Sequence, residues 1–505
     1  MPLNAVERRL VDLRHDWERF TADPTPRLLV WTVPDAAMQL VRGFLEAQKH
    51  EGEYVTHDLF IVFDTPFENS IQYSRALKEQ LAGQHAASAD DLEREGLDPS
   101  WPVAMASFPD SAYGFMRAVR SLGSTYHKAI GHLAPVLAPS SVASPRHFAA
   151  WLARALEGGL PERLRLLALD SLETPQLEAL QPAEPALLQR QTLDVDMTAV
   201  ATETFAQERT VGPAGIFRNM LMALIALVEK APAAQVLTKA RDAVAFADAQ
   251  GWKDQRVVVA MLVAGALLKE RRHDEAVATY RNARATAAAA QQEGHPAGAA
   301  MVLQTWFGEA GAALAAGRVG DAAAAYDNAA VVAQEAKNLL LAVEAFRMGA
   351  FCHARLGERE PAIERGGEAL KMGQRLRREA RGMTTLPLAA SDLLRVLDED
   401  SAQAIEAIRA RSTEQTQQLN EALEQRATLL ERTADRDPAR EAQETFAGGR
   451  ADLAQQAERE LRTVVADAEK AFQQVFAQAR RLLGDSWPLG EALSLAAAGE
   501  ERPTP

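Results

Sequence analysis

Cysteine and aromatic residues are scarce in this 505-residue chain. The single cysteine, Cys352, excludes an internal disulfide and fits a reducing compartment, and we expect it to be a small buried side chain rather than a reactive thiol. Aromatic residues make up only 6% of the sequence, whereas alanine fills runs such as RATAAAAQQ. Because alanine favours helices and lets them approach closely, the composition predicts a mostly helical protein.

Basic charge and long apolar runs are also lacking. Lysine and arginine number 55 against 69 aspartates and glutamates, and no basic patch stands out, so we expect no nucleic-acid partner. The most apolar run, MLMALIALV at 220–228, is far shorter than the roughly 20 residues that a membrane-spanning helix needs. The opening stretch MPLNAVERRLVDLRHDWERF lacks the apolar core of a signal peptide, so a cytoplasmic protein without membrane insertion is expected.

Recognisable catalytic motifs are missing as well. The sequence contains no HExxH, GxSxG or CxxC, and no GxxxxGK[ST] loop for binding phosphates. We therefore predict no catalytic residue, no metal and no cofactor, and do not expect an enzyme.

The first part of the chain, 1–180, predicts an α/β domain. The runs RLLVWTV (27–33), DLFIVFD (58–64) and RLRLLALD (163–170), and more weakly HLAPVLAPS (132–140), are continuous and apolar, as in strands buried on both faces of a parallel sheet. A helical pattern after Pro34 separates the first two runs and completes a β-α-β unit. The sheet is expected to be incomplete or degenerate.

Three aspartates follow these predicted strands. Asp35, Asp64 and Asp170 would lie at the carboxyl ends of parallel strands, where such sheets bind ligands. Aspartates in this position also cap the turn or helix that comes next. The sequence leaves both roles open.

Residues 213–380 carry a repeated pattern of small and aromatic positions. Four segments, which begin at positions 233, 276, 322 and 362, place such residues at i, i+4 and i+7: Ala233, Leu237 and Ala240; Ala276, Tyr280 and Ala283; Ala322, Tyr326 and Ala329; and Ala362, Gly366 and Ala369. The helix before each segment carries a corresponding position that is small in three of the four units: Leu221, Ala264, Ala310 and Ala350. Stacked helix pairs of this kind bury together a face that one pair alone cannot bury.

This pattern resembles the tetratricopeptide repeat, over about a third of the chain. The matching turns KERRHDEA, LAAGRVGDA and ARLGEREPA strengthen the resemblance. Leu221, Leu237, Gly366 and a period longer than the usual one depart from it. The resemblance implies an α-solenoid with a concave groove lined by the first helix of each pair. A generic alanine-rich helical bundle is the alternative.

Positions on the first helix of each pair are candidates for holding a partner protein. Apolar side chains would anchor a peptide or helix and arginines would bind its carboxylates. The alternative is that the apolar members fill the core between helices. The candidates are Arg218, Met222, Met261, Lys269, Gln304, Phe307, Arg347, Phe351 and Arg355.

An α/β unit ahead of helical repeats also resembles signal-transduction ATPases, in which a nucleotide-binding domain precedes a repeat sensor. LFIVFD with Asp64 is similar to the acidic strand end that holds Mg²⁺ in P-loop NTPases. The first strand, however, leads into WTVPDAAMQL, which has neither glycine nor lysine. The resemblance implies a degenerate domain that lacks the P-loop.

The remaining boundaries follow from composition. Residues 181–212 are expected to be a linker and residues 485–505 a partly disordered tail. Residues 388–484 show heptad-like spacing and predict two long helices, separated by a breaker at Pro438 and Gly448–Gly449. We expect an antiparallel hairpin or coiled coil whose base docks on the repeats through Phe472, Phe476 and Trp487. Pairing of these helices with another copy, giving a homo-oligomer, is the alternative.

The leading functional hypothesis is a non-enzymatic adaptor or chaperone that holds a protein segment in the repeat groove. By resemblance, the partner could be a secreted effector escorted to a bacterial secretion system. The alternative is a regulator whose first domain binds a nucleotide without hydrolysing it, and a hydrolase is a weaker third hypothesis.

Overall fold

The computed structural model describes residues 3–489 except 51, 102, 198, 201–202, 204–211 and 434. It divides into two compact units: residues 1–208 with 416–450, and residues 209–415 with 451–505. The expected tail from residue 490 and most of the expected linker after 200 lie outside the described residues. Among the described helices, none is long and apolar enough to cross a membrane.

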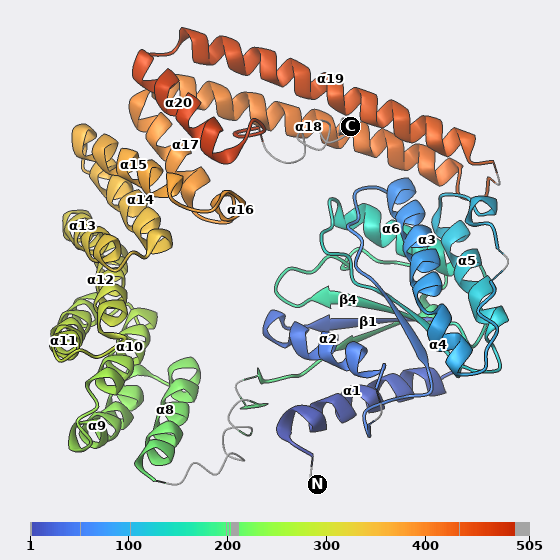
Figure 1. The fold of residues 1–505 in the computed structure, drawn as a ribbon, viewed down its shortest axis with the longest axis horizontal. Helices are drawn as coiled ribbons and strands as arrows, with labels where there is room; N and C mark the ends of the chain where they lie inside the picture. Colours follow the sequence, from blue (N-terminus) through green and yellow to red (C-terminus); the bar gives the residue numbers. More distant parts are fainter. Residues whose placement is uncertain are drawn as a thin grey trace. The chain divides into compact units, whose positions relative to one another are not determined.

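The first unit is built on a parallel sheet of five strands in the order β2-β3-β4-β1-β5. Figure 1 labels two of its neighbouring strands, β1 and β4. The strands are β1 (Leu28–Val33), β2 (Leu59–Phe63), β3 (Leu133–Leu137), β4 (Leu166–Ser171) and β5 (Leu188–Thr192). The α/β fold predicted from the four apolar runs is confirmed. β5 lies where a linker was expected. The sequence LQRQT is polar, so it did not suggest a strand, and β5 pairs only with β1 at the edge of the sheet.

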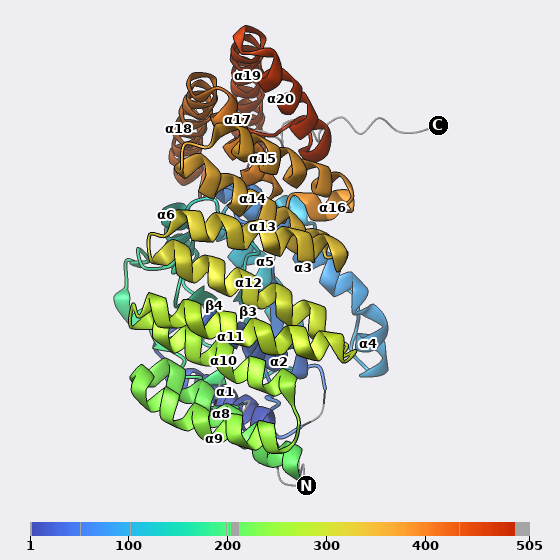
Figure 2. The ribbon, with the colours of Figure 1, turned by 90° about the vertical axis from the view of Figure 1, so that its left-hand side faces the viewer.

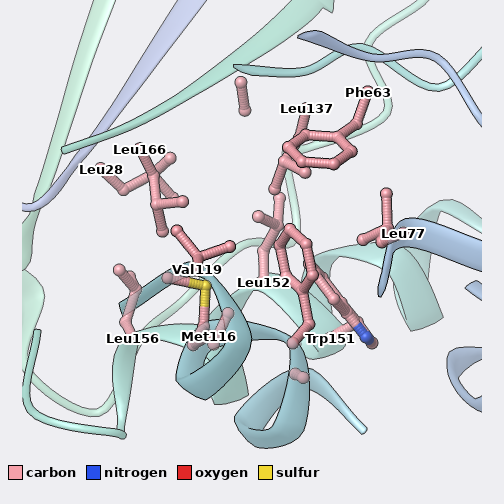
Figure 3. Packing of buried hydrophobic residues seen from close by; sticks show 14 of the residues in the cluster. Leu28, Phe63, Leu77, Met116, Val119, Leu137, Trp151, Leu152, Leu156 and Leu166 are labelled. Carbon is pink, nitrogen blue, oxygen red and sulfur yellow. The ribbon is translucent and has the colours of Figure 1, made fainter. Parts of the chain in front are cut away.

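Helices cover both faces of this sheet. α1 (Ala5–Ala22) and α2 (Met38–Ala47) pack on one face through a cluster that includes Trp17, Trp31 and Phe44. The other face packs against α3 (Ser70–Ala87), α5 (Ala112–Thr125) and α6 (Pro145–Leu156). Figure 3 shows Trp151 and Leu152 facing strand residues in that core. The short α4 (Ala89–Arg94) buries none of its residues.

The tip of a helical hairpin completes the first unit. α18 (Glu399–Leu429) and α19 (Asp437–Asp467) pack on each other there, and Ile71 of α3 joins Leu423, Ala427 and Phe446 in their common cluster. The predicted break at Gly448–Gly449 is wrong, since both lie inside α19. A Cβ on Gly449 would come 3.1 Å from Leu419 Cδ1, so this glycine permits close approach of the two helices instead of ending one.

The second unit contains four stacked helix pairs (Figure 2). Their bounds are α8 (Pro213–Lys230), α9 (Ala233–Ala249), α10 (Lys253–Lys269), α11 (His273–Gln292), α12 (Gly298–Ala315), α13 (Val319–Glu335), α14 (Leu339–Arg355) and α15 (Arg359–Gln374). The small and aromatic positions predicted to lie at helix contacts are buried in the last three pairs, including Ala264, Ala310, Tyr280 and Tyr326. Gly308 lets α12 approach α11 closely, because a Cβ at this position would overlap the ring of Tyr280.

The six helices from α9 to α14 all end in the same backbone conformation. The second residue after each helix is left-handed, with φ between 56° and 83°, and the next N–H bonds a carbonyl near the end of the helix. This is the Schellman arrangement, which favours glycine. Four of the six positions are glycine, and the others are Arg271 and Lys337.

The last helices close the second unit. α17 (Leu386–Leu397) and α20 (Lys470–Leu483) pack against α15, and the short α16 (Arg378–Arg381) contacts α20. Phe472 and Phe476 are buried in this cluster and Trp487 is half-buried. The predicted docking of these three side chains against the repeats is confirmed.

Candidate functional site

Asp170, at the carboxyl end of β4, is a buried loop anchor. Its side chain accepts backbone N–H groups from Ser171 at 3.1 Å, Gln176 at 2.7 Å and Leu177 at 3.2 Å. A carboxylate that accepts several backbone N–H groups is satisfied without a ligand. The structure therefore shows the capping role that the sequence left open.

Asp35 lies beside this loop, because β1 and β4 are neighbours in the sheet. Its Oδ1 accepts the Ser171 hydroxyl at 2.7 Å, and its N–H donates to Glu173 Oε2 at 2.9 Å. Asp64 follows β2, with β3 between it and β4, and accepts Gln80 at 3.1 Å. The sheet thus brings two of the three predicted aspartates together, and no group of three His, Cys, Asp or Glu in the described ranges is placed to hold a metal.

Glutamates of the hairpin tip occupy helix N-termini at the same edge of the sheet. Glu424 accepts the Ser70 N–H at 2.7 Å and its hydroxyl at 2.6 Å, where α3 begins. Glu431 accepts the Tyr113 N–H at 2.7 Å in the first turn of α5. Arg154 of α6 joins the two, donating to Glu431 at 2.9 Å and to the Ser70 hydroxyl at 2.8 Å.

These contacts matter because helix N-termini are anion sites in α/β folds. With Glu173 at Asp35, three N–H groups that could meet a phosphate are bonded to carboxylates of the chain itself. Glu424 and Glu431 were not predictable from the sequence, because no local pattern connects residues more than 300 positions apart. A pocket of about 810 Å³ lies beside Glu431 and is lined by Ala149, Ala153 and Arg154.

A buried cluster of charged side chains also holds the hairpin tip, through Arg436. The Asp110 carboxylate lies 2.7 Å from Lys78 Nζ, 3.0 Å from Arg75 Nε and 3.0 Å from Arg436 Nη2. Burial alone would raise the pKa of Asp110, but its hydrogen bond to Lys78 and the three cations lower it below its usual value. Arg436 is the hairpin's contribution, so this cluster ties the tip to the loop before α5.

The second candidate surface is the face of the first helices of each pair, hereafter the helix-A face: α8, α10, α12 and α14. On it, Gln304, Phe351 and Arg355 are exposed, and Arg355 lies over the Phe351 ring at 5.8 Å. Phe351 keeps 37% of its surface exposed, which is unusual for an aromatic side chain in this protein. An exposed aromatic next to an arginine is typical of protein contact surfaces.

Two predicted apolar residues of this face pack into the core instead. Met261 and Phe307 are half-buried against the same cluster, and the Phe307 ring meets Tyr326 edge-on at 5.9 Å. Met222 is half-buried as well, and Arg218 borders a hollow of about 350 Å³ together with Trp252.

Two predicted cationic residues are bonded within the chain. Lys269 donates to the Glu229 carbonyl at the end of α8. Arg347 donates to Glu344 at 2.8 and 3.0 Å and lies 3.8 Å from Asp392 of α17. A partner carboxylate would have to displace these groups to reach Arg347.

Cys352 is buried within the repeats, as expected. Burial raises the pKa of its thiol to about 11. The low thiolate fraction makes it a packing residue.

No known family model matches the sequence, and no curated protein matches it. Among solved structures, the chain is similar to a signal transduction ATPase with numerous domains (STAND) protein with a tetratricopeptide repeat sensor from Pyrococcus horikoshii. The identity is 8% and the TM-score 0.27, with 94% of this chain and 95% of that chain covered. This similarity is too low to support any site or function.

Proposed function

We propose that the chain is a non-enzymatic protein-binding adaptor that holds a segment of a partner on the helix-A face. The observation that supports this most directly is Phe351, an aromatic side chain left partly exposed on α14 beside Arg355. Leu340, on the same helix, is also exposed. Apolar side chains exposed on a rigid helical scaffold are suited to anchoring a peptide or helix.

The test compares two exposed apolar residues of the repeats: one on α14, a first helix of a pair, and one on α13, a second helix of a pair. Phe351→Glu changes the helix-A face, whereas Val331→Glu changes α13, where Val331 is 53% exposed. Loss of an aromatic anchor costs about 2 kcal/mol, or roughly thirtyfold in affinity. Partners captured with the full chain should bind Phe351→Glu at least tenfold more weakly and Val331→Glu normally. Equal binding by both variants contradicts the proposal.

The nature of the partner is a finer part of the proposal. A secreted effector that is delivered unfolded would suit a surface that holds an extended segment. If the partner is such a cargo, the adaptor should bind its unfolded form and release it on transfer, without turnover. Binding measured with folded and denatured forms of the captured partner distinguishes a cargo from a folded signalling partner.

Nucleotide binding by the α/β domain is the competing proposal. It has less support, because the N–H groups at Asp35, Ser70 and Tyr113 are bonded to the chain's own carboxylates. A ligand at 100 times its Kd would stabilise the protein by about 2.7 kcal/mol. A clear rise in melting temperature with ATP, GTP or ADP and Mg²⁺ would favour this alternative over a simple adaptor.

A further inference from the structure

Two segments of the second unit that lie almost 100 residues apart in the sequence are rich in arginine and are in contact. The stretch RLRREARGMTT (375–385) and α20 together contain seven arginines and lysines and a single glutamate. They are in contact, since Arg381 donates to the Leu482 carbonyl at 3.5 Å and α16 packs on α20. This concentration stands out in a chain of formal net charge -14.

Two of these cations bond backbone or carboxylate groups, and Arg375 donates to Met372 Sδ at 3.7 Å. Arg381 bonds three backbone carbonyls, and Arg480 forms a two-pronged ion pair with Glu458. No ion pair within the described part of the chain involves the remaining four arginines, which we call the arginine patch: Arg375, Arg377, Arg378 and Arg481. All four are exposed.

Two exposed apolar side chains follow the first three arginines of the patch in the sequence. Met383 is 90% exposed, the most exposed large apolar residue described, and Leu388 at the start of α17 is 55% exposed. The patch therefore offers guanidinium groups together with an apolar contact.

We propose that the arginine patch binds an acidic segment of a partner protein, one in which carboxylates flank an apolar residue. Guanidinium groups bind carboxylates through two parallel hydrogen bonds, and arginine suits this role better than lysine. The apolar residue of the segment would cover Met383 and Leu388. A short acidic segment needs only the patch, whereas a long nucleic acid would also be repelled by the net negative charge of the chain, which is -14.

This inference does not rest on the proposed function. The patch lies on residues 375–378 and on α20, not on the helix-A face. Phe351→Glu should therefore leave binding at the patch unchanged.

The test uses labelled peptides and the full chain in fluorescence anisotropy. The probes are a Glu/Asp peptide with leucine at every third position and an all-glutamate peptide of equal length. Reversing three charges of the patch, Arg375→Glu, Arg377→Glu and Arg378→Glu, should weaken binding of the leucine-containing peptide at least tenfold.

A matched control changes the net charge equally elsewhere in the same unit. Arg241, Arg409 and Arg459 are exposed arginines on α9, α18 and α19. Their triple glutamate variant should bind within twofold of wild type. Met383→Ser should weaken the leucine-containing peptide several-fold and leave the all-glutamate peptide unaffected.

The outcomes separate the possible occupants. Equal weakening by both triple variants would show general electrostatic attraction and overturn the proposal. Tighter binding of single-stranded DNA of matched charge, or of vesicles rich in phosphatidylserine, would also overturn it in favour of those ligands. Loss of peptide binding confined to the patch variants supports it.

Discussion

Asp110 is the group whose removal should most weaken the first unit. Its side chain is 1% exposed and lies 2.7 Å from Lys78 Nζ, which is itself 2% exposed. Lys78 has two further acceptors, the carbonyls of Phe108 and Pro109 at 2.7 and 2.8 Å. Asp110→Asn keeps the shape of the side chain but removes the only negative charge of the cluster. The lysine ammonium would then be buried without a counter-ion, beside two arginines.

The expected loss is large for a single substitution. Breaking a buried pair by removing one partner costs about 3–5 kcal/mol, because the other charge is left uncompensated. For a unit of roughly 150–250 residues, 1 kcal/mol shifts Tm by about 2–4 °C, so a drop of about 10 °C is expected. Lys78→Met should cost less, because Asp110 then keeps Arg75 and Arg436. Calorimetry of the full chain would show which transition moves.

Glu46→Gln is the matched control. Glu46 lies 2.8 Å from Lys49, almost the separation of the Asp110 pair, but both partners are about two-thirds exposed. Water screens that pair, so its loss should leave the melting temperature unchanged. If Asp110→Asn changes stability no more than Glu46→Gln, burial is not what gives the Asp110 cluster its importance.

The pH dependence has a definite sign. The pKa of Asp110 is lower in the folded protein than in the unfolded chain, so its contribution is complete above the unfolded value of about 3.9. It is lost as pH falls through the lower folded pKa. The difference in stability between wild type and Asp110→Asn should therefore shrink below about pH 4. A difference that stays constant down to pH 2 would refute the charge-based explanation.

Three further predictions concern the repeats. Gly308→Ala should lower the free energy of unfolding by about 1–3 kcal/mol, because its Cβ would overlap the Tyr280 ring. Gly311→Ala, on the same helix, meets nothing within 4 Å and should raise it by about 0.5–1 kcal/mol. Urea unfolding that shifts both variants in the same direction would contradict this packing. Arg271→Gly should raise stability by up to about 1 kcal/mol, since its φ of 58° suits glycine, and an unchanged melting temperature would count against strain at this turn. Cys352, with a thiol pKa of about 11, should react with a thiol reagent at pH 8 only as fast as the protein opens, and rapid labelling of the folded chain would show that it is accessible.

The strands show how far local patterns reach. β1, β2, β3 and β4 were predictable because each is a short continuous apolar run, as burial on both faces requires. β5 was not, because its polar residues are held by backbone hydrogen bonds to β1, and those bonds leave no mark on side-chain composition. Gly448 and Gly449 misled for a related reason: propensity suggests a break, but packing of α19 on α18 keeps the helix intact.

The repeats were the most predictable part of the chain. Positions such as Ala310 and Tyr326 recur because every helix pair has the same neighbours, so one local pattern describes several tertiary contacts. The contact surfaces were less predictable. Phe307 and Phe351 lie on equivalent helices, yet one packs in the core and the other is exposed.

The sequence by itself determined the α/β class and the helical repeats, because each depends on periodicity and propensity within short windows. It did not determine the last helices, since the two long helices expected over 388–484 are four: α17, α18, α19 and α20. Only the tertiary structure decided which distant charged segments meet. Arg381 bonds the Leu482 carbonyl about 100 residues later, and Glu424 and Glu431 reach helix N-termini more than 300 residues earlier. Such pairings follow from how distant segments pack, and neither the composition nor the spacing of either segment records them.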